Sequence, residues 1–139
     1  MSEILEELKN AYIINSFEAY AYTENNLTAE KLSQKYYEIN KSVGVIYPAD
    51  QTSDESWVYL ESLYTQPFSM SDNISSCLRS LQYYDVIKTS TAGTAEKILN
   101  NFLTSESGTT ISELSKNNNL SSCFDSEYMQ LLFEKYKSY

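Results

Sequence analysis

Apolar residues recur along most of the chain at steps of three and four, the spacing that places side chains on one face of a helix. The stretch after Thr28 shows the pattern most cleanly, and Thr28 itself fits the N-cap of a helix. Gly44 predicts the end of that helix. Its apolar positions are Ala29, Leu32, Tyr36, Ile39 and Val43.

Six further segments have the same spacing, and each predicts a helix with an apolar face. Thr94 is the predicted N-cap of the fifth helix in chain order. Thr110 and Glu113 fit a capping box at the start of the sixth. The six segments cover about residues 2–22, 54–66, 72–84, 95–103, 111–116 and 122–136.

Two short segments, 45–47 and 86–88, are rich in β-branched residues, so each predicts an extended piece or a small strand. The chain has only three glycines and two prolines, whereas an all-β protein uses many of both in its tight turns. The predicted fold is therefore mainly α, a compact bundle of six to seven helices with at most a small β element. More than half of the residues should be helical.

With 139 residues the chain has the length of one domain. We predict a single helical domain over residues 1–139, with a possible subdivision into 1–92 and 93–139. The apolar stripes also predict which side chains form the core. These are Leu32, Ile39, Trp57, Leu60, Leu78, Leu81, Ile98, Leu99, Phe102, Leu114 and Leu132.

The composition argues against catalysis. The chain has no histidine, so Ser-His-Asp and Cys-His arrangements cannot form. Cys77 and Cys123 lack the CxxC spacing of a zinc site. The three glycines fit neither a P-loop nor a dinucleotide-binding motif. We therefore expect a protein that is not an enzyme and that uses no cofactor and no metal.

The sequence also predicts a cytoplasmic location. Residues 1–7 lack the basic start and the apolar run of a signal peptide. The chain contains no stretch of about 18 apolar residues that could span a membrane. Two widely separated cysteines fit reduced thiols in the cytosol.

The last third of the chain has the order apolar helix, Gly-containing turn, short capped helix, polar turn and longer helix. Residues 110–121, TISELSKNNNLS, read much like the second helix and turn of many DNA-binding regulators. Residues 94–137 thus resemble helix-turn-helix or winged-helix domains. Residues 71–88 loosely resemble a recognition helix that runs into a wing strand. The resemblance implies a transcriptional regulator whose helix 122–136 enters the major groove of DNA.

The charges on that last helix favour a different partner. Its first turns carry Asp125 and Glu127, whereas Lys135 and Lys137 come only at the far end. Phosphate contacts from basic side chains dominate DNA affinity. A protein partner with a basic, nucleic-acid-binding surface is therefore favoured over direct DNA binding, and the winged-helix regulator stays as the alternative.

Acids and tyrosines supply the candidate binding surface. The formal net charge is −9, and thirteen tyrosines offer rigid contact area with a polar tip. Carboxylates placed like phosphates would fit a basic cleft that normally holds nucleic acid. In size and charge the chain is similar to small acidic phage or plasmid inhibitors of host nucleases, which work in this way. The candidate partner-binding residues are Glu30, Tyr37, Glu38, Asp54, Glu55, Glu61 and Tyr83.

Overall fold

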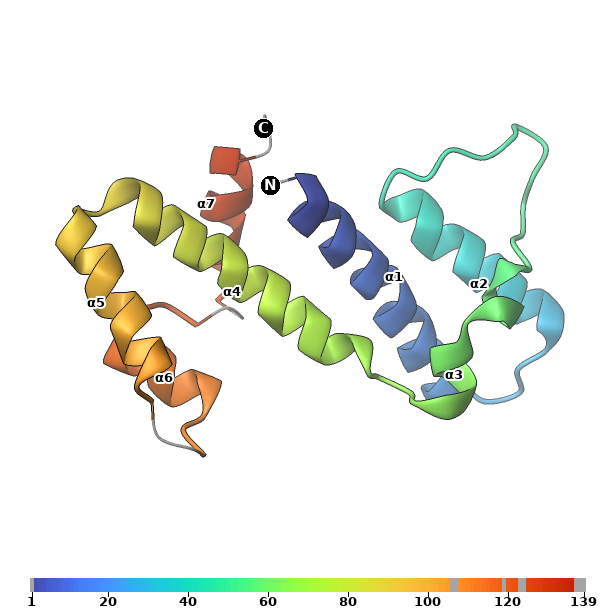
Figure 1. Ribbon diagram of the computed structural model, residues 1–139. Helices are drawn as coiled ribbons and strands as arrows, with labels where there is room; N and C mark the ends of the chain where they lie inside the picture. The colour runs from blue at the N-terminus through green and yellow to red at the C-terminus, as the bar shows by residue number, and fades with distance from the viewer. Residues whose placement is uncertain (1, 106–107, 119, 123–124, 137–139) are drawn as a thin grey trace. The chain divides into compact units, whose positions relative to one another are not determined.

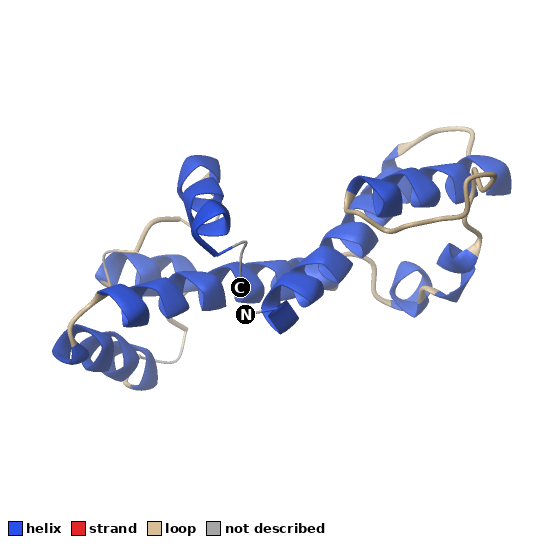
Figure 2. Cartoon of the chain, turned by 90° about the horizontal axis from the view of Figure 1, so that it is seen from above, coloured by secondary structure: helices blue, strands red, loops and turns tan. Residues whose placement is uncertain are grey.

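The computed structural model describes residues 2–105, 108–118, 120–122 and 125–136, and this part of the chain is built from helices (Figure 1, Figure 2). It contains seven α-helices, one 3-10 helix and no β-strand. Helices make up well over half of the chain, which confirms the predicted mainly α fold. The elements are α1 (Ser2–Thr23), α2 (Ala29–Ser42), η1 (Ser56–Tyr59), α3 (Glu61–Thr65), α4 (Met70–Thr89), α5 (Ala92–Leu103), α6 (Ile111–Asn117) and α7 (Ser126–Tyr136).

Neither of the two expected β segments forms a strand. Residues 45–47 lie in the loop after α2, and residues 86–88 belong to α4, which continues to Thr89. The expected strand after residue 84 is therefore wrong. Val86 and Ile87 line an open groove between α4 and α5, and the helix cost of a β-branched side chain is small enough for α4 to continue through them.

Three predicted helix bounds also differ, and one of them is the start of α7, which lies at Ser126 and not near residue 122. The single helix expected over 54–66 is divided at Leu60, whose backbone is extended, into η1 and α3. The break shifts the helical phase, so that Leu63 becomes the buried residue of α3. Thr94 is not an N-cap, because α5 already begins at Ala92.

By its internal contacts the chain divides into two compact units. The N-terminal unit is Leu5–Ile74, and the C-terminal unit is Ser75–Tyr139 together with Met1–Ile4. The dividing line falls within α4. The expectation of a single domain, with a possible subdivision at residue 92, stays a prediction.

The core of the N-terminal unit lies between α1, α2 and α3. Phe17 of α1 is fully buried and meets the Tyr36 ring of α2 edge-on, with ring centroids 5.0 Å apart. Apolar burial of this kind is the main stabilising term in a small domain. The buried cluster is Ile13, Phe17, Tyr36, Ile39 and Leu63.

The C-terminal unit packs α4 against α7. Leu81, Met129 and Leu132 form its buried cluster. Beside them, Gln82 is fully buried, and its side-chain amide donates to the Ser121 carbonyl over 3.1 Å. This bond fixes the backbone shortly before α7 and satisfies a buried polar group.

The core predicted from the stripes is largely confirmed. Leu99 is the exception, because it is 59% exposed on the face of α5 that lines the open groove. The side chain of Phe102 lies outside the described residues. The buried members are Ile39, Leu81, Ile98, Leu114 and Leu132, and the half-buried members are Leu32, Trp57, Leu60 and Leu78.

Candidate functional site

An open groove of about 520 Å³ lies in the N-terminal unit, between the first two turns of α2 and residues 52–58. Two of the residues that line it are acids, Glu30 and Glu55, and none of them is Lys or Arg. The lining residues are Ala29, Glu30, Ser33, Gln34, Thr52, Ser53, Glu55, Trp57 and Val58.

The loop side of the groove is fastened to α2 through Ser33, a buried residue. The Asp54 backbone N–H donates to the Ser33 carbonyl, and Trp57 Nε1–H donates to the Ser33 hydroxyl, each over 3.0 Å. The Trp57 ring also lies against Phe17, with ring centroids 5.9 Å apart. The wall of the groove is therefore tied both to α2 and to the core.

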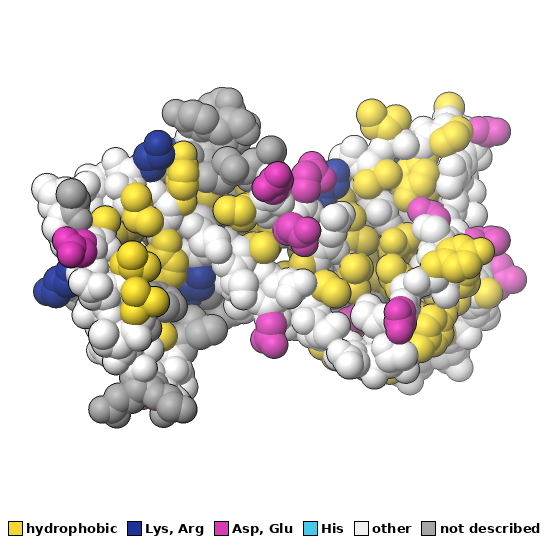
Figure 3. Space-filling model, viewed as in Figure 1, with side chains coloured by type: hydrophobic (Ala, Val, Ile, Leu, Met, Phe, Trp, Pro, Cys, Tyr) yellow, Lys and Arg dark blue, Asp and Glu magenta, His cyan; other side chains and the backbone are white. Residues whose placement is uncertain are grey.

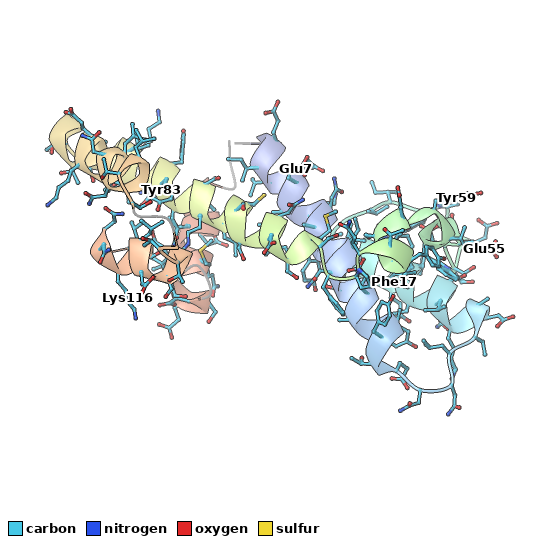
Figure 4. All side chains as sticks on the ribbon, turned by 60° about the horizontal axis from the view of Figure 1, so that its bottom comes forward. Glu7, Phe17, Glu55, Tyr59, Tyr83 and Lys116 are labelled. Atoms are coloured by element: carbon cyan, nitrogen blue, oxygen red, sulfur yellow. The ribbon has the colours of Figure 1, made fainter. Side chains whose placement is uncertain are left out.

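The two groove acids come from different elements. Glu30 lies in the first turn of α2, where its own backbone N–H and the Thr28 hydroxyl lower the pKa of its carboxyl group. It is therefore ionised at neutral pH and complements the positive end of the helix dipole. Glu55 is exposed just before η1, and Figure 4 shows it with Tyr59 at the outer edge of the N-terminal unit.

Asp54 supports the groove and does not line it. The Tyr47 hydroxyl donates to one carboxylate oxygen over 2.6 Å, and Ser56 donates to the other through its N–H and its hydroxyl, over 2.9 and 2.7 Å. Burial raises the pKa of Asp54, but these hydrogen bonds outweigh it and leave the pKa below its usual value. Burial and the nearby carboxylate raise the pKa of Tyr47, so its hydroxyl stays a donor.

Tyr37 and Glu38 lie further along α2 and already have partners within the chain. The Tyr37 ring packs against the Tyr47 ring, with centroids 4.7 Å apart, and Lys41 Nζ donates to the Tyr37 hydroxyl over 3.2 Å. Glu38 forms an exposed ion pair with Lys35, with Nζ 3.6 Å from Oε2. Exposed pairs of this kind contribute little to stability, so Glu38 can exchange its partner at small cost.

The last two predicted residues are not among those that line the groove. Glu61 is exposed in the first turn of α3 and is not among the residues that line the groove. Tyr83 belongs to α4 in the C-terminal unit, where burial raises its pKa. Of the seven predicted residues, only Glu30 and Glu55 line one common groove.

Sequence reasoning missed three residues that shape the groove. Trp57 was predicted as core, yet it both packs on Phe17 and lines the groove. Ser33 and Gln34 carried no signal of their own. The only hint in the sequence is the position of Ser33, which lies on the same side of α2 as Leu32 and Tyr36. A serine there indicates that this face meets a polar neighbour.

The negative charge is concentrated in one unit. Residues 5–74 carry eleven acids and four bases, a net charge of −7, whereas the C-terminal unit carries eight acids and six bases, a net charge of −2. In Figure 3, acidic side chains are spread over the face of the N-terminal unit that contains α1 to α3. The groove therefore lies in the more acidic unit.

The C-terminal unit has a groove of another kind, between α4 and α5. It has a volume of about 300 Å³, and no charged residue lines it. Apolar side chains gather on this part of the surface in Figure 3. Its lining residues are Tyr83, Val86, Ile87, Ala95, Ile98, Leu99 and Leu103.

The segment that resembles a helix-turn-helix has α5, α6 and α7 in the expected order. Thr110 and Glu113 form the predicted capping box, since each side chain accepts from the other's backbone N–H. Arg79, the chain's one arginine, is 9% exposed and donates to the Gln82 side chain over 3.0 Å. It is therefore part of the interior.

Within the described ranges, the structure places no three Cys, Asp or Glu side chains close enough to hold a metal ion. The same ranges contain no helix with the length and apolar character needed to cross a bilayer. Comparisons with protein-family models, with curated proteins and with solved structures gave no match.

Proposed function

We propose that this chain is a non-catalytic, acidic helical protein that regulates or inhibits another macromolecule by binding it through the groove of the N-terminal unit. The partner is a protein with a basic surface. The observation that supports this most strongly is the lining of the groove, which combines two carboxylates from separate elements with one aromatic ring and no basic side chain.

Such a groove suits the side chain of an arginine or a lysine. A carboxylate pair accepts charge-assisted hydrogen bonds from a guanidinium or an ammonium group, and Trp57 supplies the ring that attracts cations most strongly. The net charge of −7 on this unit adds steering, because opposite charges speed the encounter between two proteins.

In its more specific form, the proposal makes this protein a mimic of nucleic acid. Carboxylates then take the positions of phosphates in the basic cleft of a DNA- or RNA-handling protein in the cytoplasm, as in phage or plasmid inhibitors. The charge difference between the two units supports a mimic that uses the N-terminal unit. The C-terminal unit, with six bases to eight acids, contributes little to such a field.

A second candidate function is that of a DNA-binding regulator of the helix-turn-helix type. The capped helix α6 between α5 and α7 favours it. The start of α7 does not, because the Asp125 carboxylate accepts from the Glu127 and Tyr128 N–H groups and Glu127 is exposed beside it. Two acids at that end would repel phosphates.

The emission of Trp57 tests the proposal directly, because it is the only tryptophan in the chain and it lines the groove. We predict that titration with a nona-arginine peptide changes this emission at low salt and that the apparent Kd rises steeply with salt. Random-sequence duplex DNA is the anionic control, and a gel shift at low salt should show that it does not bind. Binding of the DNA without binding of the peptide would replace this proposal by the regulator.

A further inference from the structure

Glu18 is a fully buried acid in the second half of α1. Its carboxylate accepts two hydrogen bonds from residues more than 40 positions further along the chain. The Ser62 hydroxyl of α3 donates to Oε1 over 2.8 Å, and the Phe68 backbone N–H donates to Oε2 over 2.6 Å. A buried charge is costly unless it is hydrogen-bonded, so this carboxylate stabilises the fold only while both donors stay in place.

The segment that supplies these donors, residues 62–71, is named the strap here. Its backbone is under strain at Phe68, which has a φ of +64°. A bulky residue adopts this left-handed conformation only where its surroundings hold it there. The short bond from the Phe68 N–H to Glu18 acts at that same residue.

Two more side chains of α1 hold the strap at positions three before and four after Glu18. The Ser71 hydroxyl donates to Asn15 Oδ1 over 3.0 Å, and the Tyr22 hydroxyl donates to the Leu63 carbonyl over 2.6 Å. Asn15, Glu18 and Tyr22 therefore form one polar stripe on α1. Along this stripe the strap is fastened by polar contacts, and the two at Glu18 are made by a fully buried carboxyl group.

We propose that Glu18 is a latch. When its carboxylate no longer accepts the hydrogen bonds from Ser62 and Phe68, the strap opens from α1 as one local unit. The rest of the N-terminal unit stays folded during this opening, because α1 and α2 keep the contact between Phe17 and Tyr36. Local opening of a segment is common in native proteins, and here it also withdraws Leu63 from the buried cluster and Phe68 from the Tyr22 ring, 5.8 Å away between centroids. The latch is independent of any ligand, and therefore of the function proposed above.

The latch also lies close to the groove along the chain. Ser62 follows the groove residue Val58 by four positions, and Leu60 between them packs on the core. The segment that forms the groove wall therefore runs into the strap, with Leu60 on the core between them. The other end stays fastened to Ser33.

Hydrogen exchange of the full-length protein, read by mass spectrometry, tests the latch. In Glu18→Gln one of the two donors faces an amide NH2 and both bonds lose their charge assistance. Loss of a charge-assisted bond corresponds to about ten- to a hundredfold faster exchange. We expect this acceleration in the strap, with exchange in α2 unchanged. Glu7→Gln is the control, since it removes the same charge from an exposed position of α1.

Two results would overturn the latch. One is strap exchange in Glu18→Gln equal to that of the wild type, and the other is an equal acceleration in α2, which marks global destabilisation. If Glu18→Gln fails to fold, hydrogen exchange in the strap and in α2 is compared in Ser62→Ala instead. This variant removes one donor and leaves the carboxylate in place. Acceleration confined to the strap supports the latch, and no acceleration or a uniform one rejects it.

Discussion

Asp54 shows how one side chain makes the groove depend on pH. Its pKa is lowered in the folded protein by hydrogen bonds from Tyr47 and Ser56, which outweigh burial. The stabilisation that it provides is therefore complete above the pKa of the unfolded chain, about 4, and is lost as the pH falls through the lower folded value.

We predict that Asp54→Asn is less stable than the wild type at neutral pH and that the difference shrinks as the pH falls below about 4. Urea unfolding followed by Trp57 emission, at neutral and at acid pH, measures both. A stability difference that is the same at the two pH values would show that the charge of Asp54 is not what holds the loop.

At the residue scale, the sequence predicted Glu30 and Glu55 as binding residues, and the structure places both in one groove. The sequence could not predict that both carboxylate oxygens of Asp54 accept hydrogen bonds from within the chain. Its partner Tyr47 lies seven positions away, and only the path of the loop brings the two together. Acidity along a chain shows which side chains carry charge, but the fold decides which are free to meet a partner.

At the element scale, local capping chemistry predicted two of three helix starts, and Thr94 failed because α5 begins at Ala92. Thr28 accepts from the Lys31 N–H, and Thr110 forms a capping box with Glu113, as predicted. The other errors came at a helix break and at a helix end. The break at Leu60 turns Leu63 toward the core, and residues 86–88 continue α4, with Val86 and Ile87 beside the groove to α5.

The capping box leads to a prediction for α6. Thr110→Ala removes the acceptor of the Glu113 N–H and should lower the free energy of unfolding by about 0.5–2 kcal/mol. Ser112→Ala is the matched control, because Ser112 is exposed on the same helix and alanine is a better helix former. Chemical denaturation followed by circular dichroism compares the two, and equal stability of both variants would contradict the role of the cap.

At the scale of the whole molecule, the uneven charge matters more than its total. The N-terminal unit has a net charge of −7 and the proposed binding groove, whereas the C-terminal unit has a net charge of −2 and an apolar groove. The total of −9 was evident from composition, but its division was not, because the boundary lies within α4. A helical period continues across such a boundary and gives no sign of it.

The central claim is that Glu30 and Glu55 bind the basic partner through the groove, and one comparison tests it most directly. Nona-arginine is titrated into the double variants Glu30→Gln/Glu55→Gln and Glu6→Gln/Glu7→Gln, with Trp57 emission as the signal. Both variants lose two negative charges from the N-terminal unit, but Glu6 and Glu7 are exposed on α1 and do not line the groove. We predict that the groove variant binds at least about tenfold more weakly than the wild type, and the control less than about twofold. Equal weakening in both variants would mean that only bulk charge attracts the peptide, and would contradict the groove as the binding site.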